Sequence, residues 1–126
     1  MKFTIELPWP SRELFPNARL HWARKANAVK RHRAFARLET CKSGAFAQAQ
    51  GRVFWRLDWW APDRRHRDED NLIAACKSYL DGVAEALQVD DFRFRLREIE
   101  DHEPKKGGLL KLTFWSETND NQNDHA

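Results

Sequence analysis

The chain has 126 residues, which is enough for one domain with a modest hydrophobic core. Hydrophobic residues make up 41% of it, with six Trp and eight Phe, and this composition excludes a natively unfolded chain. The net charge is only +3, but the sequence pI near 9.1 is high enough to make a nucleic-acid partner worth testing.

The sequence has no feature of a membrane or secreted protein. No stretch approaches the ~20 apolar residues that a membrane-spanning helix needs. The N-terminus, MKFTIELPWP, alternates in polarity and does not resemble a signal peptide. The two cysteines, Cys41 and Cys76, do not form a metal-binding pair. We therefore expect a cytoplasmic protein without a membrane partner, in which both thiols are buried and reduced.

The first half of the chain predicts a strand, a loop, a helix and a second strand. Residues 2–7 (KFTIEL) alternate with period two, as a half-buried strand does. Three prolines in PWPSRELFPN then predict an ordered loop. Helix formers dominate from about Ala23 to Ala47, which predicts one long helix or a broken pair. The stretch RVFWRLDWW alternates again and predicts a strand that ends before Pro62.

The second half predicts a helix followed by two strands. From Asp70 to Gln88, one arc of a helix is apolar and the opposite arc is polar. FRFRLRE and LLKLTFW predict strands on either side of a turn, EPKKGG. The fold class is therefore α+β, with a small mixed β-sheet packed with two main helices over residues 1–115. Residues 116–126 form a polar tail that we expect to be disordered.

Carboxylates flank the second predicted helix. Asp68 and Asp70 lie at its start, and Asp90 and Asp91 follow its end. Carboxylates from separate segments are the ligands that Mg²⁺ prefers. Spacing alone favours a simpler role as helix cap and turn residues. A helix of 18 residues is about 27 Å long, so the sequence does not explain how Asp91 would reach the first pair.

Lys77 lies on the polar arc of the same helix and has two possible roles. It can pair with Asp81 one turn on, which would stabilise the helix by about 0.2–0.5 kcal/mol. It lies seven residues after Asp70 and so returns to the same face, where it could contact a phosphate bound to a metal ion. The sequence does not choose between these roles.

Residues 19–37 form a basic run without a single acid. A solvated face is the ordinary role of such a run, but its like charges repel unless an anion offsets them, and DNA phosphate is such an anion. The aromatic residues Trp9, Phe15 and Trp22 lie near the run, and a core position is the first expectation for each. Asn17 and His21 could donate to a phosphate or organise a metal site.

These motifs together resemble the RusA family of Holliday-junction resolvases. LPWP followed by PNARLHW and a basic helix is similar to the N-terminal region of that family, and DEDNL…K…LDG…DD is similar to its catalytic core. The resemblance covers most of the chain, from IELPWP to KLTFW. In the best-known form of the family the lysine lies closer to the first carboxylates. That nearer position is Ala74 here, so Lys77 lies about one helical turn, or 5 Å, farther on.

The resemblance implies a Mg²⁺-dependent endonuclease, with Mn²⁺ as a possible substitute, that nicks four-way DNA junctions symmetrically in recombination and repair. It implies a homodimer that binds branched DNA. The implied metal ligands are Asp68, Asp70 and Asp91, and Lys77 would complete the catalytic set. The expected DNA-binding residues are Asn17, His21, Arg24, Lys25, Lys30, Arg65 and Arg67. The alternatives are a non-catalytic branched-DNA-binding module of the same fold and a nuclease that acts mainly on flaps or other branched DNA.

Overall fold

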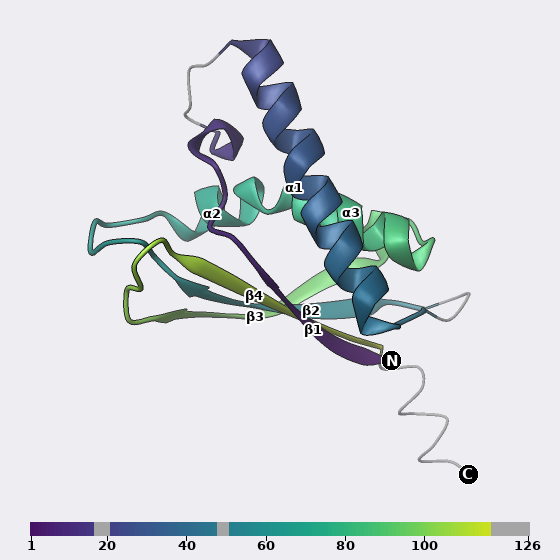
Figure 1. Cartoon of the computed structure of the whole chain (residues 1–126). Helices are drawn as coiled ribbons and strands as arrows, with labels where there is room; N and C mark the ends of the chain where they lie inside the picture. The colour runs from purple at the N-terminus through teal and green to yellow at the C-terminus, as the bar shows by residue number, and fades with distance from the viewer. Residues whose placement is uncertain (17–20, 48–50, 117–126) are drawn as a thin grey trace.

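A computed structural model describes residues 1–16, 21–47 and 51–116 of the chain. Its four strands form one mixed sheet in the order β1-β4-β2-β3, in which β2 and β3 are parallel and the other neighbours are antiparallel. Helices α1, α2 and α3 lie on the same face of this sheet (Figure 1). The expected α+β class with a small mixed sheet is confirmed. The elements are β1 (Lys2–Leu7), η1 (Arg12–Leu14), α1 (Trp22–Ser43), β2 (Val53–Trp60), α2 (Glu69–Ala75), α3 (Lys77–Leu87), η2 (Asp91–Arg93), β3 (Phe94–His102) and β4 (Leu109–Ser116).

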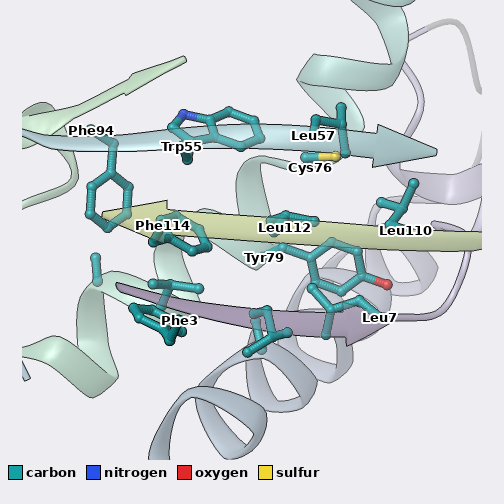
Figure 2. Close-up of a cluster of buried hydrophobic side chains, with 14 of the residues drawn as sticks. Phe3, Leu7, Trp55, Leu57, Cys76, Tyr79, Phe94, Leu110, Leu112 and Phe114 are labelled. Carbon is teal, nitrogen blue, oxygen red and sulfur yellow. The ribbon is translucent and has the colours of Figure 1, made fainter. Parts of the chain in front are cut away.

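The core lies between the sheet and the helices, as Figure 2 shows. Alternate residues of the strands, such as Leu7, Trp55 and Phe114, point to the helices and are buried. Tyr79 of α3 is completely buried among them, and its hydroxyl donates a 2.7 Å hydrogen bond to the carbonyl oxygen of Pro8. This bond ties the loop after β1 to the helical layer, so the loop has a defined position over the sheet.

A close contact between α1 and α3 depends on Gly82. A Cβ at this position would lie 2.2 Å from the carbonyl oxygen of Arg33 and 3.1 Å from the Cβ of Ala36. A glycine in the middle of a helix normally destabilises it by roughly 1 kcal/mol relative to alanine. Here it allows the two helix backbones to approach each other, which gives a packing reason for a residue that the amphipathic pattern only tolerates.

The expectation of a single helix from Asp70 to Gln88 is wrong, because two helices occupy these residues. Cys76 separates α2 from α3, with a ψ of −3° instead of a helical value. The Cys76 amide still donates to the carbonyl oxygens of Leu72 and Ile73, at 3.2 and 3.1 Å. The break therefore leaves no backbone donor unpaired and requires no special residue at this position. The apolar side of the pattern therefore continues across an interruption that no glycine or proline announces.

Three smaller expectations also need correction. Cys76 is buried as expected, but Cys41 is exposed on α1. Trp22 is 76% exposed and is no core residue, whereas Trp9 and Phe15 pack against the core as expected. The third strand begins at Phe94, since residues 91–93 form a 3₁₀ turn first. Residues 117–126 of the expected tail lie outside the described part of the chain, and Ser116 is the last residue of β4.

Candidate functional site

Lys77, Asp81 and Asp91 form a cluster at the start of α3, which we call the lysine–carboxylate cluster. The Lys77 Nζ donates a hydrogen bond to Asp81 Oδ1 at 2.9 Å and another to Asp91 Oδ2. The pairing of Lys77 with Asp81 one turn on is confirmed. Asp91 reaches the lysine because Gln88 ends α3 in the left-handed conformation, with φ 58°, and η2 then lies next to the helix. The chain thus turns back along α3 and returns a carboxylate to its beginning.

The cluster is ionised and open to solvent. The Asp91 carboxylate, followed by that of Asp81, raises the pKa of Lys77 above its usual value, and Lys77 lowers the pKa of Asp91. The Lys77 side chain is 63% exposed and that of Asp91 is 42% exposed. Exposed ion pairs of this kind contribute only about 0–1 kcal/mol to stability. The cluster therefore contributes little to the stability of the fold.

Asp68 is the N-cap residue of α2. Its Oδ1 accepts hydrogen bonds from the backbone amides of Asp70, at 2.8 Å, and Asn71, at 3.3 Å. The capping role that spacing favoured is therefore real. It uses Oδ1, and in the described part of the chain the other oxygen, Oδ2, takes no hydrogen bond or ion pair. The cap and a ligand role are thus compatible at this residue.

Asp70 is exposed in the first turn of α2, and its carboxylate makes no ion pair within the described ranges. Asp68, Asp70 and Asp91 do not gather into one tight group. The residues that the structure describes contain one set of three acidic or histidine ligands whose atoms lie within 4.8 Å of one another, and that set is elsewhere. Asp91 therefore does not join Asp68 and Asp70 in such a set, and it is bound to Lys77 instead.

A hollow beside Lys77 brings the basic helix to the cluster. It has a volume of about 280 Å³ and lies between the N-terminal half of α1 and the junction of α2 with α3. Lys25 of α1 lines it together with Lys77 and Asp81, and its apolar wall includes Leu14 and Val29. A residue expected to bind DNA and the residue expected to act in catalysis thus border the same space.

The basic run is partly neutralised by α3. Arg33 and Arg37 both pair with Glu85, at 2.8 and 3.5 Å, so an acid distant in sequence offsets two of the cations. By contrast, the three expected DNA-binding cations of α1 have no ion pair with any described residue. These cations are Arg24, Lys25 and Lys30, and all three are exposed. No acid among the described residues offsets their positive charge.

The other expected DNA contacts have more varied surroundings. His21 is the N-cap of α1, and its Nδ1 accepts from the Ala23 amide at 3.2 Å. Arg65 and Arg67 both pair with Asp63, at 3.0 and 2.8 Å. The Arg67 side chain is only 15% exposed, whereas that of Arg65 is 82% exposed and has surface to offer. Asn17 lies outside the described residues.

Sequence reasoning missed a second polar cluster on the sheet face that points away from the helices. Asp58 of β2 accepts a 2.8 Å hydrogen bond from His102 of β3, and Glu100 lies 3.3 Å from the same ring nitrogen. These three residues are the tight set of possible metal ligands mentioned above. Arg56 donates to both oxygens of Asp58 at 2.8 Å, and it lowers the pKa of that carboxyl. The negative charge of Asp58 that a metal ion would compensate is therefore already offset by Arg56. In the sequence, only the pairing of β2 with β3 could have indicated that these residues lie together.

Comparison with known proteins gives a relative but no named activity. A protein of Xylella fastidiosa that bears the name "Uncharacterized protein" is 37% identical over 114 residues, which are 88% of this chain and 74% of that protein. The chain belongs to the family of this Xylella protein. No protein-family model matches the chain. In the described part of the structure, no helix combines the length and apolar character needed to cross a bilayer.

Proposed function

We propose that the chain is a Mg²⁺-dependent, structure-selective DNA endonuclease that resolves four-way junctions by paired symmetric nicks, as its resemblance to the RusA family implies. The observation that carries the proposal is the approach of Asp91 to Lys77. Fourteen positions separate the two residues, yet they share a hydrogen bond. Both were expected in the site from motif positions alone. A contact between them is what a shared role in one site requires.

The carboxylates fit the donor set of a magnesium ion. Mg²⁺ takes few protein oxygens and keeps several waters, so one or two carboxylates suffice to bind it. Asp70 has an unpaired carboxylate among the described residues, and Asp68 has one oxygen outside its cap bonds. These two would hold the ion, and Asp91 would join them only by releasing Lys77. When bound, the ion would polarise the scissile phosphate and lower the pKa of an attacking water.

The remaining groups of the chain have roles that follow from their charges. A lysine is protonated at neutral pH, and the neighbouring Asp91 and Asp81 raise the pKa of Lys77 further, so it can stabilise negative charge that develops on a phosphate. Asp91 and Asp81 orient its ammonium group. Arg24 and Lys30 of α1, with Lys25, would bind the DNA backbone, since phosphate contacts supply affinity and position.

A homodimer completes the proposal. A four-way junction is close to two-fold symmetric, and a two-fold dimer would place one site on each of two opposed strands. A monomer could cut one strand at a time, and paired nicks would then be uncorrelated. The dimer is thus a requirement of symmetric resolution and not of strand cleavage itself.

The test is cleavage of a synthetic four-way junction by the purified protein with and without Mg²⁺. We expect paired nicks at symmetric positions in Mg²⁺ and none in EDTA. A flap and a linear duplex of the same sequence serve as control substrates. Equal cleavage of all three would contradict structure selectivity. Tight junction binding with no cleavage in Mg²⁺ or Mn²⁺ would favour the non-catalytic binding module.

A further inference from the structure

A second hollow has an aromatic floor. It has a volume of about 420 Å³ and is formed by the loop after β1 and the loop after β2. The rings of Trp9 and Phe15 are stacked in it, with centroids 6.5 Å apart and planes inclined by 27°. We call it the aromatic hollow. Its lining consists of Trp9, Pro10, Arg12, Phe15, Pro62, Arg65, His66 and Arg67.

The floor of the aromatic hollow is held rigidly. Trp9 packs on Trp59 of β2, with a centroid distance of 6.0 Å, and the Arg67 guanidinium lies 5.4 Å from the Trp9 ring centre. Gly108 allows this position, since a Cβ there would lie 2.8 Å from the Cβ of Trp9. The Tyr79 hydroxyl fixes the neighbouring Pro8 carbonyl. A preformed surface of this kind loses little entropy when it binds a ligand.

The rim of the aromatic hollow is positively charged. Three arginines line it, while a single carboxylate, Asp63, pairs with two of them, Arg65 and Arg67. The third, Arg12, is exposed and has no ion pair in the described part of the chain. His66 adds an exposed imidazole. The hollow thus combines flat aromatic surface with cations that no acid fully offsets.

This combination matches one nucleotide of an unpaired strand. Proteins bind single-stranded nucleic acid by stacking bases on aromatic rings and by tracking the phosphates with basic side chains. Arg67 directly precedes Asp68, so a nucleotide in the hollow would adjoin the proposed metal ligands. We propose that the aromatic hollow holds one unstacked nucleobase of branched DNA, beside the phosphate to be cut. The proposal rests on the proposed function, because it specifies how the substrate of that site is held.

Removal of single bases from the DNA tests the proposal. Four-way junctions are made with one abasic residue at each of several positions around the nick, and binding is measured without Mg²⁺. Loss of a base that stacks in the hollow should weaken binding by about 5- to 150-fold, in line with the worth of one base–aromatic stack. Abasic residues elsewhere should have little effect.

The variant Phe15→Leu keeps the apolar volume and removes the ring. It should weaken binding of the intact junction and lose its response to the decisive abasic position. Phe46→Leu is the matched control, because Phe46 is 80% exposed beyond the C-terminal end of α1 and outside the hollow. This control should respond to base removal as the wild-type protein does. Equal responses of wild type and Phe15→Leu would overturn the proposal.

A cross-link with wild-type protein makes the test independent of the stability of any variant. An iodouridine at the decisive position should cross-link to Trp9 or Phe15 on irradiation, and a cross-link elsewhere in the chain would contradict the hollow. A protein that nicks the intact junction but shows no position-dependent response to base removal would overturn the hollow alone. A protein that neither binds nor nicks the junction would overturn the hollow and the proposed function together.

Discussion

Asp91 accepts a hydrogen bond from Lys77, which lies at the opposite end of the helix that separates the two residues. The left-handed Gln88 and the 3₁₀ turn that follows it bring the carboxylate back beside α3. The adjacent Asp90 is exposed as well, but its carboxylate makes no ion pair in the described residues. Two neighbouring acids with such different surroundings allow a controlled comparison.

We expect Asp91→Asn to lower the rate of junction nicking by 100-fold or more, because Lys77 loses its charged partner and the site loses a carboxylate. The free energy of unfolding should change by less than about 1 kcal/mol, since the pair is exposed. Asp90→Asn is the control and should nick at the wild-type rate. Nicking assays with urea titrations of both variants provide the measurement. Loss of activity in Asp90→Asn and not in Asp91→Asn would show that the role belongs to Asp90.

The cations of α1 should differ in their effect on DNA binding. Replacing Arg24 and Lys30 with Ala should lower the slope of log K against log salt by about 1.8, which is 0.9 for each lost phosphate contact on duplex-like arms. Replacing Arg33 and Arg37, which pair with Glu85, should change the slope much less. Binding curves at several salt concentrations measure both pairs. Equal slope changes would mean that the charge of the run acts without regard to its ion pairs.

Gly82→Ala should destabilise the fold although alanine is the better helix former. Helix propensity alone would stabilise the variant by about 1 kcal/mol. The new methyl group would instead meet the Arg33 carbonyl oxygen, at 2.2 Å before any adjustment, and overpacking of this kind typically costs about 1–3 kcal/mol. The urea midpoint of unfolding measures the sign directly. A variant more stable than wild type would show that α1 and α3 are not in close contact.

The buried His32 should make stability depend on pH. Its Nδ1 donates to the Ala28 carbonyl oxygen at 2.8 Å, and its Nε2 accepts from the Ser11 amide at 3.2 Å, so the fold binds the neutral ring. Burial lowers the pKa of His32 below 6.5, nearby Arg31 lowers it further, and the Ala28 bond and Glu13 oppose the change. The unfolded chain therefore takes up the proton first, and stability is lost as pH falls from above 6.5 toward the folded pKa.

Urea titrations at pH 7.5 and pH 5 test this dependence. The drop in the free energy of unfolding should be smaller in His32→Gln than in the wild-type protein. His66→Gln, which changes an exposed histidine, should keep the wild-type drop. If His32→Gln loses stability between these pH values as strongly as wild type, another group is responsible.

Local patterns predicted most of the fold, because strand burial alternates and helix burial follows one arc. β1 occupies residues 2–7, as KFTIEL indicated, and β2 and β4 end within a residue of the expected strands. The break at Cys76 was invisible, since it preserves the apolar face and needs no special residue. The contact of Asp91 with Lys77 and the pairing of Arg33 with Glu85 depend on how separate elements pack, which spacing along a chain does not encode.

The aromatic hollow has the same origin. Trp9 and Phe15 were expected in the core, and both do pack against it, but both also line an open space. Two of the three arginines that border this space, Arg65 and Arg67, come from the loop after β2, at least fifty positions later in the chain. Only the arrangement of the two loops shows that these residues meet.

Comparison of junction nicking by the wild-type protein and by Asp70→Asn tests the central claim most directly. In Mg²⁺ the wild-type protein should produce paired nicks, and Asp70→Asn should produce none while it binds the junction at least as tightly, because loss of a carboxylate removes repulsion of phosphate. Circular dichroism should show the same fold for both, since Asp70 is exposed. Wild-type-like nicking by Asp70→Asn in Mg²⁺ would contradict the assignment of this carboxylate to the metal site.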